Sequence, residues 1–210
     1  MLYLVAGMNR SGSTWLYNVV RLLLARSGAP DLAAGWVEDR EKLLKHRTAV
    51  VKVHIFDPSL LIEPYMVLTS HRDLRDVAAS LARKFKLPAS VEMTRYVFNQ
   101  YRRWAELARF DMCYEAMIAD APAMVGQVAA ALGVEVDATA QAEVAAEVDA
   151  AKRSIRADTR GFDPQTLLHT GHITDGRPGS WREDLSPERA DEIVKGFRSW
   201  MELQGYLSDP

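Results

Sequence analysis

Residues 7–15, GMNRSGSTW, place two glycines, three hydroxyl side chains and an arginine directly after an apolar run. A glycine loop between a strand and a helix directs several backbone N–H groups and the positive helix end at one point, which attracts phosphate or sulfate. The hydroxyls of Ser11, Ser13 and Thr14 and the planar guanidinium of Arg10 suit a tetrahedral anion. A nucleotide triphosphatase would carry lysine at position 13. The stretch therefore predicts an anion-binding site that differs from that of a nucleotide triphosphatase. The alternative is a glycine-containing turn with a Ser/Thr helix cap and no ligand.

A lysine and a histidine two residues apart form the second candidate. In VVKVHIFD, residues 50–57, Lys52 and His54 share one side if the segment is a strand, because side chains alternate across a strand. Strands of a helix-covered parallel sheet are ordinarily apolar on both sides. The pair therefore either lines a cleft or lies on the solvent side of an edge strand, and the spacing alone leaves both open.

The third candidate is TSHRDLRDVAASLARKF, residues 69–85. Arg72 follows an apolar run that reads as a strand, and Ser80 lies eight residues later in the expected helix. Taken alone, the stretch also fits a structural interpretation, in which its charged residues form a solvated first helical turn and Ser80 is a small packing residue.

Strand and helix signals alternate through the front of the chain. The expected strands are 2–6, 49–55, 65–70 and 110–114, and the expected helices are 14–26, 73–86, 91–108 and 121–132. This alternation favours βαβ units. We expect a three-layer α/β fold, P-loop-like, with a central parallel sheet flanked by helices and ligands bound beyond the carboxyl ends of the strands.

The back third is less regular. Helices are expected over 138–151 and from 186 to about 204, while residues 156–181 hold four glycines, two histidines and two prolines without periodicity. Loops of this length in a compact domain are usually functional or disordered. We expect one domain, residues 1–210, in which residues 152–185 form a lid or acceptor-side loop.

Composition limits the function classes. The 210 residues are 48% apolar and 26% charged, with a net charge of -2, which predicts a soluble protein without general attraction to nucleic acid or membranes. The single cysteine, Cys113, excludes an internal disulfide and a cysteine-based zinc cluster. No stretch approaches the roughly 20 apolar residues of a membrane span, and we expect a cytoplasmic location.

These stretches, and their order along the chain, resemble the motifs of the PAPS-dependent sulfotransferases (PAPS, 3′-phosphoadenosine 5′-phosphosulfate). The chain as a whole resembles a small bacterial-type member of that family. GMNRSGSTW is similar to the family's 5′-phosphosulfate loop, RDLRDVAAS to its 3′-phosphate motif, and the K-V-H of 52–54 to the K-T-H of its cytosolic branch. CYEAMIADAPAMVGQVAAALGV resembles the tyrosine–glutamate segment, and GRPGSWREDLSPE the C-terminal G-x-x-G-x-W stretch. The matches extend from residue 7 to about residue 188.

The resemblance implies a role for each matching residue. The implied donor-binding residues are Arg10, Ser11, Gly12, Ser13 and Thr14 for the phosphosulfate, Trp15 and Tyr114 for the adenine side, and Arg72 and Ser80 for the 3′-phosphate. His54 would be the general base, and Lys52 and Arg10 would stabilise charge on the transferring group. PAPS would be the co-substrate, no metal would take part, and the acceptor would be a small-molecule hydroxyl or amine. The sequence predicts no oligomeric state.

Two departures leave alternatives open. The family's C-terminal motif often carries an arginine–lysine pair for the 3′-phosphate, and alignment on the glycines puts Thr174 and Asp175 there. Gly176 and Arg177 are assigned to the donor site on this alignment, and the substitutes for the missing cations are Arg177, Arg153 and Arg160. Some branches use an early glutamate as the base, which makes Glu38 a rival of His54.

Two rival functions follow from the same residues. A kinase-like phosphotransferase would need ATP and Mg²⁺, and only Asp57 is placed to act as its metal-binding acid. A nucleotide-binding module without turnover would not need the Lys52/His54 pair. His169 and His172 are three residues apart but lack a matching third ligand, so they indicate hydrogen bonds within the lid rather than a metal.

Overall fold

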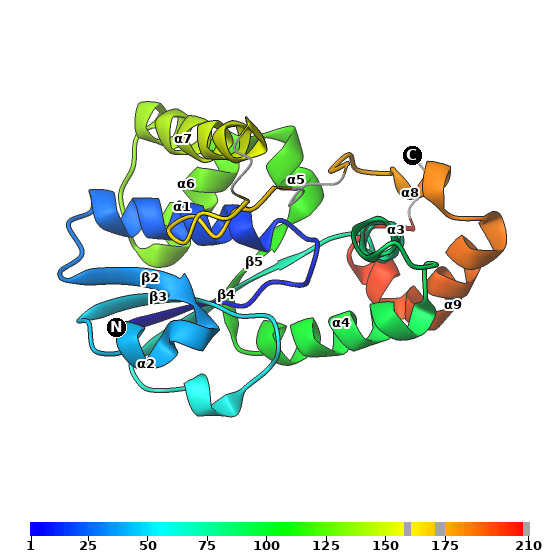
Figure 1. Ribbon diagram of the computed structural model, residues 1–210, viewed down its shortest axis with the longest axis horizontal. Coiled ribbons are helices and arrows are strands. Elements are labelled where there is room, and N and C mark those ends of the chain that lie inside the picture. The colour runs from blue at the N-terminus through cyan, green and yellow to red at the C-terminus, as the bar shows by residue number, and fades with distance from the viewer. Residues whose placement is uncertain (158–160, 171–174, 208–210) are drawn as a thin grey trace.

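The computed structural model describes residues 1–157, 161–170 and 175–207, in which a five-stranded sheet lies between layers of helices (Figure 1). The strands are β1 (Leu2–Val5), β2 (Leu32–Trp36), β3 (Thr48–Lys52), β4 (Tyr65–His71) and β5 (Ala108–Cys113). Their order is β2-β3-β1-β4-β5, and every neighbouring pair is parallel. The predicted α/β fold with a helix-flanked parallel sheet is confirmed.

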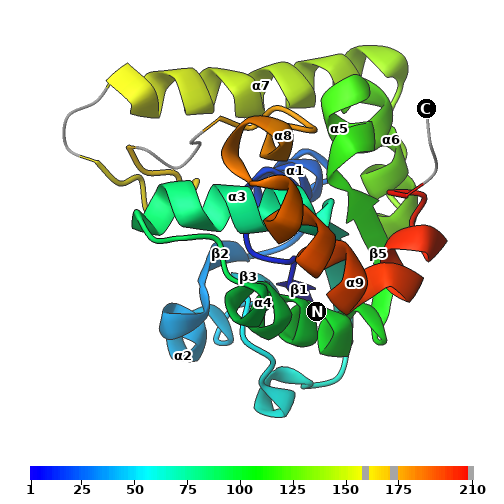
Figure 2. The same cartoon turned by 90° about the vertical axis from the view of Figure 1, so that its right-hand side faces the viewer.

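The helices divide into three groups around this sheet. Their bounds are α1 (Ser13–Arg26), α2 (Arg40–Leu43), α3 (Leu74–Phe85), α4 (Val91–Ala105), α5 (Tyr114–Ala119), α6 (Ala121–Leu132), α7 (Ala138–Ala157), α8 (Trp181–Asp184) and α9 (Pro187–Leu203). Helices α1 and α6 cover one face, with α5 beside α6 and α7 packed on the outer side of α1 and α6, and α2 and α4 lie on the other face. Helices α3, α8 and α9 lie beyond the carboxyl ends of the strands, and Figure 2 shows this side of the molecule facing the viewer.

Both faces of the sheet bury apolar side chains. Val5, Val50 and Leu68 pack against α1 and α6, while Leu4 and Val51 pack against Trp104 of α4. Strands β1 and β3 are apolar on both sides along most of their length, as a covered parallel sheet requires, and Lys52 stands at the carboxyl end of β3. Within the described parts of the chain, no helix combines the length and apolar character needed to cross a membrane.

Several elements differ from the sequence expectation. The short helices α2, α5 and α8 were not expected, and α4 ends at Ala105 instead of residue 108. Strand β2 was not expected, β3 ends at Lys52 instead of residue 55, β5 ends one residue before Tyr114, and α7 continues to Ala157. Beyond Lys52 the chain leaves the sheet towards a short 3-10 helix, η2 (Pro58–Leu60). His54 therefore lies just after the strand, so the prediction that Lys52 and His54 share one strand side is wrong in detail, although both side chains reach the same cavity.

Candidate active site

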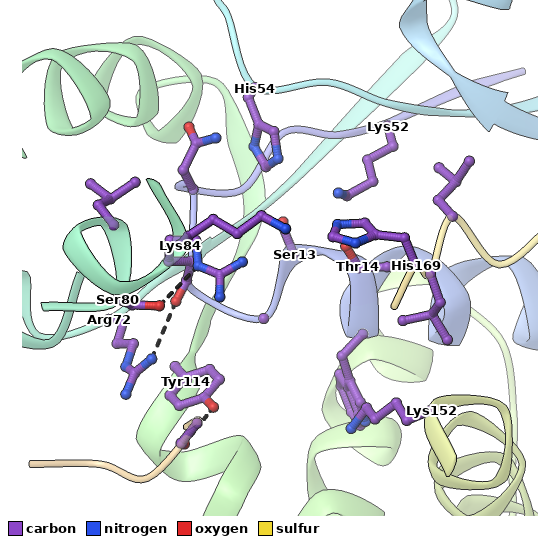
Figure 3. A pocket seen from close by; sticks show the side chains of 18 of the residues that line it. Ser13, Thr14, Lys52, His54, Arg72, Ser80, Lys84, Tyr114, Lys152 and His169 are labelled. Carbon is purple, nitrogen blue, oxygen red and sulfur yellow. Dashed lines mark hydrogen bonds between the residues drawn. The ribbon is translucent and has the colours of Figure 1, made fainter. Parts of the chain in front are cut away.

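A cavity of about 870 Å³ opens at the carboxyl ends of β1, β3 and β4 (Figure 3). The predicted site residues that line it are Arg10, Gly12, Ser13, Thr14, Trp15, Lys52, His54, Arg72, Ser80, Tyr114, Gly176 and Arg177. Ser11 is the exception, because its hydroxyl lies behind the loop and donates to the carbonyl oxygen of Met8 at 2.6 Å. The fold thus brings together residues that are spread over most of the sequence.

The glycine loop (residues 7–15) is shaped by its two glycines. A Cβ on Gly7 would lie 2.1 Å from Ser70 Oγ, so the loop can pass β4 only with hydrogen at that position. Gly12 has φ +80°, in the left-handed region, and a Cβ there would approach the Tyr114 ring to 3.0 Å. The loop then enters α1 at Ser13, which brings the N-terminus of a 14-residue helix to the cavity, a natural anion site.

Two arginines line the side of the cavity next to α3. Arg10 donates from Nε to Ser80 Oγ at 2.9 Å, and burial, followed by the charges of Arg72 and Arg83, lowers its pKa. The Arg72 guanidinium lies 4.3 Å from the centre of the Tyr114 ring and donates to a carbonyl oxygen, that of Arg177, at 2.9 Å. These contacts hold both guanidinium planes at the cavity wall.

Lys52 is almost completely buried, with 3% of its surface exposed. Its ammonium nitrogen lies 4.5 Å from the centre of the Trp36 ring. Burial, and then the charge of Arg10, lower the pKa of Lys52 to about 7. A cation held in this way has lost hydration that an anionic ligand could replace.

His54 presents one particular nitrogen to the cavity. Its Nδ1 lies 2.7 Å from the carbonyl oxygen of Gly7. Because a carbonyl can only accept, Nδ1 carries the proton, and Nε2 of the neutral ring keeps its lone pair. Burial, and then the charge of Lys52, lower the pKa of His54 well below its ordinary value. The imidazole is therefore neutral near pH 7, with Nε2 unprotonated.

The far wall is formed by the strap (residues 175–181). Tyr114 donates to the carbonyl oxygen of Gly176 at 2.6 Å. Arg177 is 60% exposed and pairs with Asp175 and Glu183 at 2.9 and 2.8 Å, so two carboxylates already offset its charge. Of the other predicted substitutes for the missing cations, Arg153 does not line the cavity and Arg160 lies outside the described residues. Thr174, one of the two positions where those cations are missing, also lies outside the described residues.

Asp76 of α3 fastens the strap to the cavity wall. This carboxylate is fully buried. It accepts from Gly179 N at 2.7 Å, from Trp181 N at 2.9 Å and from Ser180 Oγ at 3.2 Å. Its Oδ2 also lies 3.3 Å from Arg72 Nη2. One buried acid therefore ties α3, Arg72 and the strap together.

The carboxylates and histidines considered in the sequence fall in different places. Glu38 is exposed and does not line the cavity, whereas its neighbour Asp39 does. Asp57 also lies away from the cavity, where its Oδ1 accepts from Ser59 N at 2.9 Å. His169 lines the cavity, and His172 lies outside the described residues. The described part of the chain contains no group of three metal-ligating side chains.

Sequence reasoning missed several further lining residues, among them Trp36, Lys84, Phe85, Lys152 and Phe162. Trp36 belongs to the unexpected strand β2. The one sequence signal for Lys84 was its helical spacing. It lies one turn after Ser80 and therefore shares a helix face with it.

Comparison with known proteins finds no matching family model and no matching curated protein. Solved structures do match: mouse sulfotransferase SULT7A1 complexed with PAP (adenosine 3′,5′-bisphosphate) has a TM-score of 0.67 at 15% identity, over 96% of this chain and 84% of that one. Retinol dehydratase with androsterone and inactive cofactor PAP has a TM-score of 0.63 at 16% identity, over 95% and 80%. Its complex with retinol and PAP gives 0.62 at 17%, with the same coverage. The chain therefore has the sulfotransferase fold.

Proposed function

We propose that the protein transfers a sulfuryl group from PAPS to a hydroxyl or amine of a small-molecule acceptor. One observation carries this proposal: Arg10, Lys52 and His54 meet at the N-terminus of α1, and burial together with neighbouring positive charges lowers the pKa of each. Like charges held together out of water are unfavourable unless an anion joins them. The fold, shared with PAP-bound sulfotransferases, indicates which anion that is.

The proposed reaction breaks the bond between sulfur and the bridging oxygen of the 5′-phosphosulfate and forms a bond between sulfur and the acceptor atom. Negative charge then develops on the leaving phosphate oxygen, where Arg10, Lys52 and the backbone N–H groups of the loop stabilise it. The acceptor's proton passes to His54 Nε2. Each role needs a donor or acceptor that the geometry already supplies.

The remaining predicted residues would hold the rest of the donor. Arg72 and Ser80 lie together at the α3 side of the cavity, suited to the 3′-phosphate. Trp15 and Tyr114 offer aromatic surface for the adenine side. The acceptor would enter next to His54, where Trp36 packs edge-on against the imidazole at 5.4 Å between ring centres.

Nucleotide selectivity tests this function. PAP is expected to raise the melting temperature more than 5′-AMP does, because only PAP carries the 3′-phosphate. Ligand at a hundredfold excess over Kd stabilises a protein by about 2.7 kcal/mol, which a thermal-shift assay resolves. Ser80→Ala should reduce the shift with PAP and leave that with 5′-AMP unchanged. Equal shifts for the two nucleotides would remove the 3′-phosphate site, and a larger shift with ATP and Mg²⁺ would favour the phosphotransferase.

Proton uptake on binding is a second expectation. With a pKa of about 7 in the free protein, Lys52 is mostly neutral at pH 8. A bound anion favours the charged form, so PAP binding at pH 8 should take up protons and should weaken as pH rises above 7. Calorimetry in two buffers of different ionisation enthalpy measures this uptake. Lys52→Met should abolish it, and net proton release by the unaltered protein would contradict the assignment.

A further inference from the structure

Lys84 is a cavity residue that none of the roles above uses. It lies on α3, four residues after Ser80, so the two share one helix face. Figure 3 shows its side chain extending from α3 across the cavity towards Ser13 at the start of α1. Its neighbour Lys86 is exposed and does not line the cavity. The inward direction is thus particular to Lys84.

Lys84 is partly exposed, whereas Lys52 is buried, but the charge of Arg10 acts on both. Burial, and then the charge of Arg10, lower the pKa of both lysines. The two side chains approach the glycine loop from different elements, Lys52 from β3 and Lys84 from α3 (Figure 3). The loop is therefore flanked by cations on two sides, which suits a group bearing several charged oxygens.

The place of Lys84 along α3 decides which part of the donor it can reach. The 3′-phosphate residues, Arg72 and Ser80, lie nearer the N-terminus of this helix. Lys84 is one turn further on, and its side chain points toward Ser13, in the loop assigned to the phosphosulfate. The alternative, that it replaces the missing cations at the 3′-phosphate, would require it to point the opposite way.

We propose that Lys84 is a third cation of the reacting centre and binds the sulfuryl oxygens of PAPS. This inference rests on the proposed function. During transfer the sulfur–oxygen bond to the phosphate breaks, the bond to the acceptor forms, and the acceptor's proton goes to His54. Lys84 keeps its own proton throughout and holds the sulfuryl oxygens, while Arg10 and Lys52 stabilise the leaving oxygen.

Comparing PAPS with PAP isolates this contact, because PAP lacks the sulfuryl group. Titration calorimetry without acceptor gives both affinities. Lys84→Met is expected to lower PAPS affinity by about tenfold or more, as for a hydrogen bond to a charged group, and to change PAP affinity by less than about twofold. Lys84→Arg should retain PAPS binding. Lys86→Met, on the same helix end, should affect neither nucleotide.

The outcomes separate this proposal from the function on which it rests. If the unaltered protein binds both nucleotides and Lys84→Met leaves their affinity ratio unchanged, Lys84 does not bind the sulfuryl group, although the donor site stands. Equal losses for PAP and PAPS would place Lys84 on the phosphates and also overturn the proposal. An unaltered protein that binds neither nucleotide would overturn the proposed function itself.

Discussion

Replacing His54 with alanine is expected to lower kcat by about 10²–10⁴, the usual cost of removing a general base. The carbonyl of Gly7 fixes the proton on Nδ1, so Nε2 is the atom lost to the reaction. PAP affinity should change little, because the assigned nucleotide contacts come from the glycine loop, Arg72 and Ser80. Transfer of labelled sulfate from PAPS, with an acceptor found by screening, measures kcat, and calorimetry measures PAP binding.

Nearby carboxylates provide the matched controls. Glu38→Gln changes an exposed side chain away from the cavity and should leave kcat unaltered. Asp39→Asn tests the carboxylate that does line the cavity and is also expected to retain turnover. Retention of most activity by His54→Ala, together with its loss in either carboxylate variant, would transfer the role of base to that carboxylate.

Asp76→Ala is expected to destabilise the protein by about 3–5 kcal/mol, the range for removing one partner of a buried ion pair. The change leaves the buried Arg72 guanidinium without its carboxylate, and three donors of the strap lose their acceptor. Urea unfolding measures the loss, and PAP binding should fall with it. Asp191→Ala, at an exposed aspartate, is the control and should cost little.

A double variant distinguishes the ion pair from general damage to the core. Removing both charges avoids leaving one of them buried and unpaired, so Arg72→Met combined with Asp76→Ala should cost less than the sum of the two single changes. Additive losses, or a loss below about 1 kcal/mol for Asp76→Ala alone, would mean that the pair does not hold the strap.

The regular part of the fold could be predicted because its signals are local. Helix α6 matches the expected residues 121–132. The helices expected from residues 73 and 186 do begin there, where the side chains of Asp73 and Ser186 accept from the backbone N–H groups of Arg75 and Arg189. Apolar runs followed by capping residues specify such elements without help from the rest of the chain.

The features that sequence reasoning missed depend on tertiary contacts. Strand β2, with the sequence LAAGW, has little intrinsic strand tendency. It forms because it pairs with β3 along its length and because Gly35 leaves room for Leu43. A short 3-10 turn, Val37–Asp39, likewise decides which of two neighbouring carboxylates reaches the cavity. Asp39 lines the cavity and Glu38 does not.

The strap also determines when the cavity is completed as the chain folds. Asp76 and Tyr114 bind strap residues that lie 103 and 62 positions further along the chain. All five strands end before residue 114, so every strand of the sheet precedes the strap in the chain. Closing a long loop costs conformational entropy before the contact it forms contributes any stability. A chain that folds as it is synthesised can therefore form the whole sheet before the strap, and it completes the cavity wall only when the strap has docked.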